Sequence, residues 1–471
     1  MPWPEGMTPV RMRRVAVVVP RAALRDALVR IAEAGCVELD RVEETAPGPA
    51  ALRLRRLQGR GGPETPGRAA LAVAAPDLDR LEDRRETSLL AGEAELEERA
   101  RGAVRQGEVS ALAGWCPAAE VPRVAERLAA AGGALLPLPS PRGADPPTLL
   151  RPAGEVSFTP LVTTYGTPSY ADLDPSWPAG LAYLVMFGIM FGDVGHGALL
   201  VLGALALRFG RSRRLARLHR LWPFLAGAGL AAMLAGAAYG EFFGPTGVLP
   251  VLWLAPLRSP ARLLAAAVVF GAGLLVLAHV AGAVNRVREG GWARGLYAAS
   301  GVAGLLFYLG LASAAAGLVL YVTPVASAGA ALACAGLALV ALGLFRNTAG
   351  GGAGVAETGV RLFDVVVRTG TNTLSFARLA AFGLTHAALA DLVWRGTTGL
   401  AARGAAWWAG AVLLFAVGTA LSFGLEALVA GVQALRLEFY EIFSRLFEAE
   451  GRPFRPWHVP PAEPADTLPR R

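Results

Sequence analysis

The stretch TNTLSFARLAAFGLTHAALADLVW, residues 371–394, places one arginine, Arg378, in the middle of an apolar run. A second apolar run, SFGLEALVAGVQALRLEFYEIF (422–443), contains Arg436. An arginine at mid-bilayer costs about 2.5–3.5 kcal/mol on insertion scales, and its guanidinium keeps its proton inside proteins. Charged residues in such runs usually face a bundle interior or a water-filled path, where they mark a route for ions. The two arginines are therefore the first candidate functional residues.

The composition indicates a membrane protein with a soluble portion. Of the 471 residues, 54% are hydrophobic and 17% are charged, and the mean hydropathy is +0.44. The chain contains no lysine, which excludes a Walker A nucleotide site because that motif needs its lysine. The net charge of +8 comes from arginines clustered at the ends of apolar segments, which favours membrane topology over nucleic-acid binding.

The cysteines give no sign of a metal or redox site. Cys36, Cys116 and Cys334 lack the required spacings, so we expect all three to be buried, and we expect neither a metal nor a cofactor. The first apolar run, VAVVV (15–19), is too short for a signal peptide. We therefore expect the amino terminus to lie in the cytoplasm.

Residues 1–175 are predicted to form a small cytoplasmic α+β lobe. Strand–helix–strand patterns occupy 12–44 and 109–139. Between them, a Pro/Gly/Arg-rich stretch at 47–75 is interpreted as a linker, and the charged stretch 77–107 as a short, solvated helical arm. No catalytic constellation is visible in this lobe, so it suits the docking of partner proteins.

The predicted membrane domain, 176–450, contains seven apolar stretches and precedes a cytoplasmic tail, 451–471. A simple span needs about 20 residues. The stretches are 177–207, 221–244, 261–286, 294–321, 324–345, 361–396 and 403–447.

The arginine-rich loop 208–220 should be cytoplasmic, so the first stretch must enter the membrane and return as a hairpin. FGDVGHG (191–197) supplies the break. Loops at 285–294 and 345–352 fall on the same side. The prediction is an α-helical polytopic domain of about eight membrane helices, the last two long and tilted, with both termini cytoplasmic.

Polar residues form one stripe on each of the two long helices. At 100° per residue, Asp364 and Arg378 lie about 40° apart around their helix, and His386 lies two turns beyond Arg378. On the last stretch, three polar residues fall within an arc of about 80°. They are Glu426, Gln433 and Arg436. Such stripes are typical of a water-linked proton path.

Structural roles remain open for most of these residues. Arg436 could snorkel to the interface, and His386 could simply hydrogen-bond to a neighbouring helix. Asp364 could be a first-turn acid paired with Arg368. For Asp193 and His196 in FGDVGHG, the favoured role is structural, namely capping of the helix break. Glu241 in YGEFFG could lie at a channel mouth or act as a cap.

Six ordered motifs resemble those of the membrane stator subunit of V-type and A-type rotary ATPases, called subunit I in bacteria and archaea and subunit a in eukaryotes. They are GWCPAAEVPRVAERL, DPPTLLRPAGEVSFTPLVTTYGTPSYADLDPSW, MFGIMFGDVGHG, YGEFFG, SFARLAAFGLTHAAL and ALRLEFYEIFSRLFEAEGRPFRPW. The resemblance runs from the first predicted strand to the tail. The soluble part is much shorter than is usual in that family, chiefly in its helical arm.

The resemblance implies roles for the polar residues. Arg378 matches the essential stator arginine and Arg436 a second one. The positions of Asp364, where the family often has Glu, and of Glu426, His386 and Gln433 match polar sites of the proton path. The implied protein is a non-catalytic, proton-translocating subunit of the bacterial or archaeal plasma membrane. Its implied partners are the proteolipid c/K ring, peripheral stalk subunits, indirectly the central-stalk adaptor of the ring, and the lipid bilayer.

Two other classes of function remain as alternatives. A secondary transporter would show inverted repeats and paired broken helices, whereas one broken stretch and no repeat are visible. A non-conducting membrane anchor for stalk proteins would leave Arg378 without a role.

Overall fold

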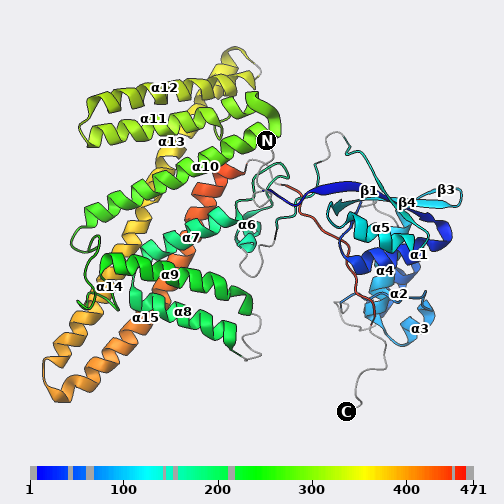
Figure 1. Ribbon diagram of the computed structural model, residues 1–471, viewed down its shortest axis with the longest axis horizontal. Coiled ribbons are helices and arrows are strands. Elements are labelled where there is room, and N and C mark those ends of the chain that lie inside the picture. Colours follow the sequence, from blue (N-terminus) through cyan, green and yellow to red (C-terminus); the bar gives the residue numbers. More distant parts are fainter. Residues whose placement is uncertain are drawn as a thin grey trace. The chain divides into compact units, whose positions relative to one another are not determined.

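The computed structural model describes residues 8–40, 46–59, 68–141, 145–151, 158–210, 218–348, 350–447 and 451–462. The chain divides into two compact units (Figure 1). One unit draws on 9–150 and on the tail from 451, and the other on 151–450. The first is a small α+β unit and the second is helical, so the predicted fold class is confirmed at this level.

The α+β unit is built on an antiparallel sheet with the strand order β2-β4-β1-β5, and β3 pairs with β4. The strands are β1 (Met12–Pro20), β2 (Glu38–Leu39), β3 (Val104–Gln106), β4 (Val109–Pro117) and β5 (Ala134–Pro137). The helices are η2 (Arg21–Ala23), α1 (Leu24–Ala34), α2 (Pro49–Gly59), α3 (Leu78–Asp83), α4 (Thr87–Arg101) and α5 (Val121–Ala129). Alternate valines of β1 are buried because successive side chains of a strand point to opposite faces.

Two sequence predictions in this unit are wrong. The stretch 47–75, interpreted as a linker, contains helix α2, because Leu57 packs with Leu81 and Leu90 in a small apolar cluster. The single solvated helix expected at 77–107 is instead α3, α4 and strand β3, and Leu90 is fully buried. Burial was expected for all three cysteines. In this unit Cys116 is buried and Cys36 is partly buried, but Cys334, in the helical unit, is exposed.

The tail packs into the core of the α+β unit. Trp457 and Val459 are buried in the main apolar cluster with the first strand and helix. The indole of Trp457 donates a hydrogen bond of 3.0 Å to Glu95, and Arg452 forms an ion pair of 2.8 Å with Glu38. These contacts fix the described part of the tail, 451–462, to this unit.

Within its described residues, the helical unit contains six helical stretches that are long and apolar enough to span a membrane, and two shorter apolar helices. Its elements are α6 (Thr159–Tyr165), α7 (Ser176–Met190), α8 (Val194–Phe209), η3 (His219–Leu221), α9 (Trp222–Tyr239), α10 (Pro260–Tyr297), α11 (Val302–Val319), α12 (Thr323–Arg346), α13 (Gly351–Ser375), α14 (Ala377–Ala401), η4 (Ala405–Trp407), α15 (Trp408–Leu437), the π-helical segment η5 (Glu438–Phe443) and α16 (Ser444–Leu446).

The first apolar stretch is broken into α7 and α8 around FGD (191–193), and α9 packs against both halves. Small residues allow this close approach. A side chain at Gly236 would overlap the backbone at Asp193 and Val194. Part of the arginine-rich loop expected at 208–220, residues 211–217, lies outside the described residues.

The prediction of a loop at 285–294 is wrong. Helix α10 continues through this stretch to Tyr297, with a kink at Gly291 (φ 75°). Several of its polar side chains find partners within the protein. Arg286 pairs with Glu289 at 2.6 Å, and Asn285 accepts a hydrogen bond from the Leu173 amide at 2.9 Å. These contacts let a polar helix end remain folded.

The last two apolar stretches are long helices with local irregularities. α13 and α14 form one continuous stretch of 51 residues that is irregular at Phe376, and η4 through α16 form a second stretch of 42 residues. The second passes through η5, and π-helical turns occur frequently at functional sites.

Candidate functional site

A hydrogen bond between α14 and α15 joins two of the predicted site residues. Nδ1 of His386 donates to the carboxylate of Glu426. The side chain of His386 is buried, and its Nε2 has no hydrogen-bond partner among the described residues. The packing of α14 against α15 brings these two residues, 40 positions apart, into contact.

The break between α7 and α8 adds its own polar residues to this pair. The rings of Phe191 and His196 lie 5.2 and 5.4 Å from that of His386. Glu241, from the loop after α9, is buried and lies within electrostatic range of His386. Together with Asp193, five of the nine predicted residues thus form one cluster, which we call the histidine cluster (Asp193, His196, Glu241, His386 and Glu426).

Asp193 has a clear structural task in the histidine cluster. As the N-cap of α8, its Oδ1 accepts a hydrogen bond from the His196 amide at 2.9 Å and one from the Phe243 amide at 3.0 Å. Its Oδ2 accepts one from the Gly244 amide at 2.8 Å. One fully buried carboxylate therefore holds the helix break against the loop after α9.

Three members of the histidine cluster could in principle hold a metal ion. Asp193, His196 and His386 each place one ligand atom within 4.8 Å of the others. Because three backbone amides already bond to the Asp193 carboxylate, we assign that residue to capping and build no metal chemistry on the group.

The two arginines lie beside the irregular turns of the long helices. Arg378 is the second residue of α14, and Arg436 is the last but one of α15. Neither forms an ion pair with any described residue, and Nη1 of Arg378 is buried without a hydrogen-bond partner there. Glu441 of η5 lies within electrostatic range of both. The pair carries more positive charge than the neighbouring carboxylate can neutralise.

The remaining predicted residues lie outside the histidine cluster. Asp364 is exposed and forms an ion pair of 3.1 Å with Arg368, as anticipated from their spacing. It also lies within electrostatic range of Arg445, which in turn interacts with Glu441. Gln433 has a buried Oε1 with no hydrogen-bond partner among the described residues.

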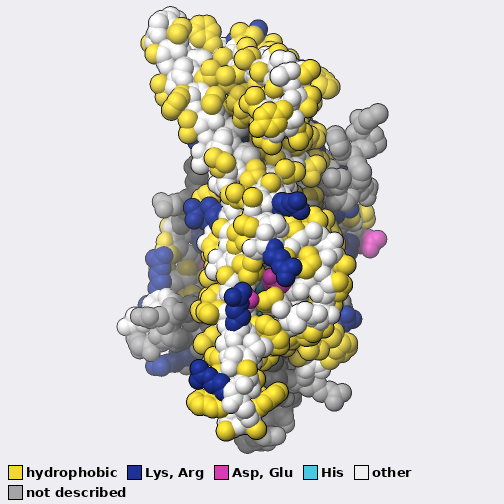
Figure 2. Space-filling view, turned by 90° about the vertical axis from the view of Figure 1, so that its left-hand side faces the viewer, with side chains coloured by type: hydrophobic (Ala, Val, Ile, Leu, Met, Phe, Trp, Pro, Cys, Tyr) yellow, Lys and Arg dark blue, Asp and Glu magenta, His cyan; other side chains and the backbone are white. Residues whose placement is uncertain are grey.

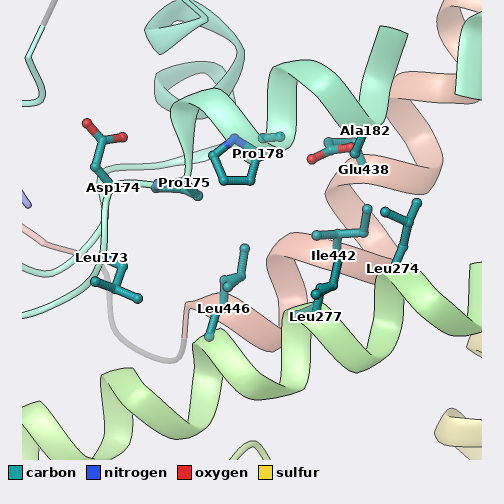
Figure 3. A pocket seen from close by; sticks show the side chains of 13 residues that line it. Leu173, Asp174, Pro175, Pro178, Ala182, Leu274, Leu277, Glu438, Ile442 and Leu446 are labelled. Atoms are coloured by element: carbon teal, nitrogen blue, oxygen red, sulfur yellow. The ribbon is translucent and has the colours of Figure 1, made fainter. Parts of the chain in front are cut away.

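Sequence reasoning missed the acidic residues of η5. Glu441 and Glu438 are both buried, and neither carboxylate oxygen of Glu438 has a hydrogen-bond partner within the described chain. Figure 3 shows Glu438 opposite Ala182 of α7, at an apolar cavity of about 120 Å³. The signal in the sequence that could have found them is the presence of these two acids within the apolar run 403–447.

The face that carries the long helices is largely apolar. Figure 2 shows hydrophobic side chains over most of it, interrupted by a scattered file of arginines. Large apolar side chains of α13, α14 and α15 are exposed, among them Phe363, Leu392, Leu425 and Val432. Arg436 is exposed as well.

Comparison with known proteins agrees with this arrangement. Residues 103–243 match the V-type ATPase 116kDa subunit family. An A-type ATP synthase subunit I of Halobacterium salinarum is 29% identical over 66% of this chain and 51% of its own length. Subunits of the same name from Thermococcus kodakarensis and Saccharolobus solfataricus are 26% and 25% identical, over 74% and 66% of this chain and 54% of their own lengths.

The chain spans about half the length of these relatives. The similarity to these relatives nevertheless covers most of the chain, and the match to the family model, 103–243, includes the broken helix. The chain is thus similar to the V-type ATPase 116kDa subunit family and to subunits I of A-type ATP synthases.

Proposed function

We propose that the chain is the membrane stator subunit of a V/A-type rotary ATPase, in which it forms two proton half-channels against a rotating proteolipid ring. The observation that carries the proposal is the positive charge of Arg378 and Arg436, which forms no ion pair with any described residue, on long helices with an exposed apolar face. A charge of this kind calls for an anionic partner supplied by another molecule.

The partner that fits is a carboxylate carried by each small helical subunit of the ring. Such a carboxylate must be neutral while it faces lipid, because an unpaired charge there is expensive. When it arrives beside Arg378, the guanidinium favours its ionised form, as an opposite charge within about 4–6 Å does. The released proton leaves through one half-channel, and a new proton arrives through the other.

The arginines also separate the two half-channels. A guanidinium cannot act as a proton donor at physiological pH, so protons cannot pass directly from one half-channel to the other. The remaining route leads around the ring, and proton flow is thereby coupled to rotation. ATP chemistry belongs to other subunits, and this chain is non-catalytic.

We assign the histidine cluster to the outer half-channel. His386 and Glu426 are hydrogen-bonded to each other, and each keeps one buried atom, Nε2 and Oε1, without a partner among the described residues. Gln433 would continue this path. Asp364, with Arg445 and Glu441 between it and Arg378, suits the cytoplasmic half-channel.

The complete proposal includes about eight membrane helices, the hairpin α7–α8 counted as two, with both termini in the cytoplasm of a bacterium or archaeon. The α+β unit and tail would dock the peripheral stalks, and the central-stalk adaptor would be reached only through the ring.

Co-purification tests the proposal. A tagged full chain, isolated from its own organism in mild detergent, should bring down a proteolipid ring and stalk subunits. If the chain co-purifies with stalk proteins but without a ring, it is a membrane anchor. If it purifies alone and transports a solute, it is a transporter. Either result would overturn the proposal.

A further inference from the structure

A second polar site lies at the ends of α10 and α12, where the proposed proton path assigns no role. A cavity of about 610 Å³ opens between these two helix ends. Its lining includes Arg294, Tyr297, Arg346 and Asn347. This volume falls within the range of about 300–1,000 Å³ that is usual for small-molecule sites.

The chain builds this cavity through the kink in α10. Gly291 has φ 75° and ψ −176°, a conformation that L side chains rarely adopt, so the last turn of α10 departs from the helix axis. Gly343 of α12 then lies directly against Tyr297. The two glycines together leave the space that both arginines line.

Both arginines are exposed, and neither has an acidic partner among the described residues. The guanidinium of Arg346 lies 4.6 Å from the ring centre of Tyr297, which restricts its orientation. Two aromatic residues next to lining residues in the sequence are exposed as well: Trp292, which is 78% exposed, and Phe345. Exposed aromatic residues beside arginines are typical of the membrane–water interface.

We propose that this cavity binds the phosphate group of an anionic phospholipid. Two unpaired guanidinium groups match phosphate oxygens, to which arginine donates paired hydrogen bonds. Basic pockets between membrane helices recognise anionic headgroups. The apolar surfaces of α10, α11 and α12 directly beside the cavity would receive the acyl chains, which makes a lipid the better source of phosphate than a free ion.

Arginines in the last turn of a helix also complement the helix dipole, so the test needs a control with that feature. Arg208 provides it: it is exposed, occupies the last turn of α8 and lies 4.3 Å from the ring centre of Trp222, outside the cavity. The proposal requires that replacement of Arg294 and Arg346 weakens lipid binding and that replacement of Arg208 does not.

The experiment is native mass spectrometry of the purified full chain with phosphatidylglycerol or phosphatidylcholine, and separately with inorganic phosphate. The wild type should retain one phosphatidylglycerol at least tenfold better than phosphatidylcholine. The double variant Arg294→Gln/Arg346→Gln should lose that preference, and Arg208→Gln should keep it. Ala293→Trp, which fills the rim but keeps both arginines, should also lose it.

Three results would overturn the proposal. The first is equal retention of phosphatidylglycerol by the double variant and the wild type, and the second is equal loss of the preference in Arg208→Gln. The third is binding of inorganic phosphate with no retained lipid, which would make the cavity a site for a soluble anion. Because no ring or stalk subunit takes part, these outcomes are independent of the stator assignment.

Discussion

Replacement of Asp193 by alanine should open two segments of the helical unit at once. The carboxylate accepts three hydrogen bonds, from the amides of His196, Phe243 and Gly244. Hydrogen bonds to charged groups contribute about 1.5–3 kcal/mol each. Because the three share one carboxylate and are not strictly additive, we expect the loss to cost about 4 kcal/mol. At about 1.4 kcal/mol per tenfold change, local opening should become roughly 10³-fold more frequent.

Hydrogen exchange measured by mass spectrometry on the full chain reports this opening. Peptides covering 191–200 and 240–247 should lose protection together in Asp193→Ala. In Asp193→Asn, which keeps an oxygen for the His196 and Phe243 amides, the same peptides should lose much less protection from exchange. The matched control is Asp77→Ala, because Asp77 is an exposed N-cap of α3 whose loss should cost about 1 kcal/mol. Unchanged protection at 240–247 in Asp193→Ala would refute the proposed bridge.

Three further predictions address the proton path, helix packing and pH. Glu426→Gln should slow coupled proton transport by roughly tenfold or more with assembly intact, and an unchanged rate in reconstituted vesicles would leave Glu426 a structural role. Gly317→Leu should lower the thermal midpoint by several degrees, since its side chain would overlap the backbone of Ala326 between α11 and α12, whereas Gly273→Leu, with open space around it, should not. Burial, followed by the neighbouring Glu289, raises the pKa of Asp172 to about 7. The folded state therefore holds a proton that the unfolded chain releases, and unfolding free energy should fall as the pH rises from about 4 to about 7. Asp172→Asn should weaken this dependence of the unfolding free energy on pH. An identical pH profile in the variant and the wild type would contradict the role of Asp172.

The sequence predicted the helical class because long apolar runs have few alternatives in a membrane. It failed where polar residues satisfy one another inside a helix. The stretch 285–294 has the composition of a loop, yet Asn285 and Arg286 find partners that become visible only in the folded chain. Likewise, 47–75 has the composition of a linker, and the packing of Leu57 against the leucines of α3 and α4 is visible only in the folded chain.

The candidate site was predictable in its residue types but not in its pairings. His386 and Glu426 lie on different helices, and their hydrogen bond depends on how α14 packs against α15. The capping role favoured for Asp193 could be inferred from its position before α8, but its bonds to the amides of Phe243 and Gly244 could not. Glu441 escaped notice because an acid five residues after Arg436 resembles the end of a membrane helix.

The most direct test of the account is proton pumping by the reconstituted complex that carries Arg378→Ala. The account predicts that coupled transport is abolished while the ring and stalks still assemble, because the guanidinium that favours the ionised form of the ring carboxylate is then missing. Arg368→Ala, which removes an exposed arginine already paired with Asp364 on the same long helix, should retain most of the activity. Transport near the wild-type rate in Arg378→Ala would contradict the central claim.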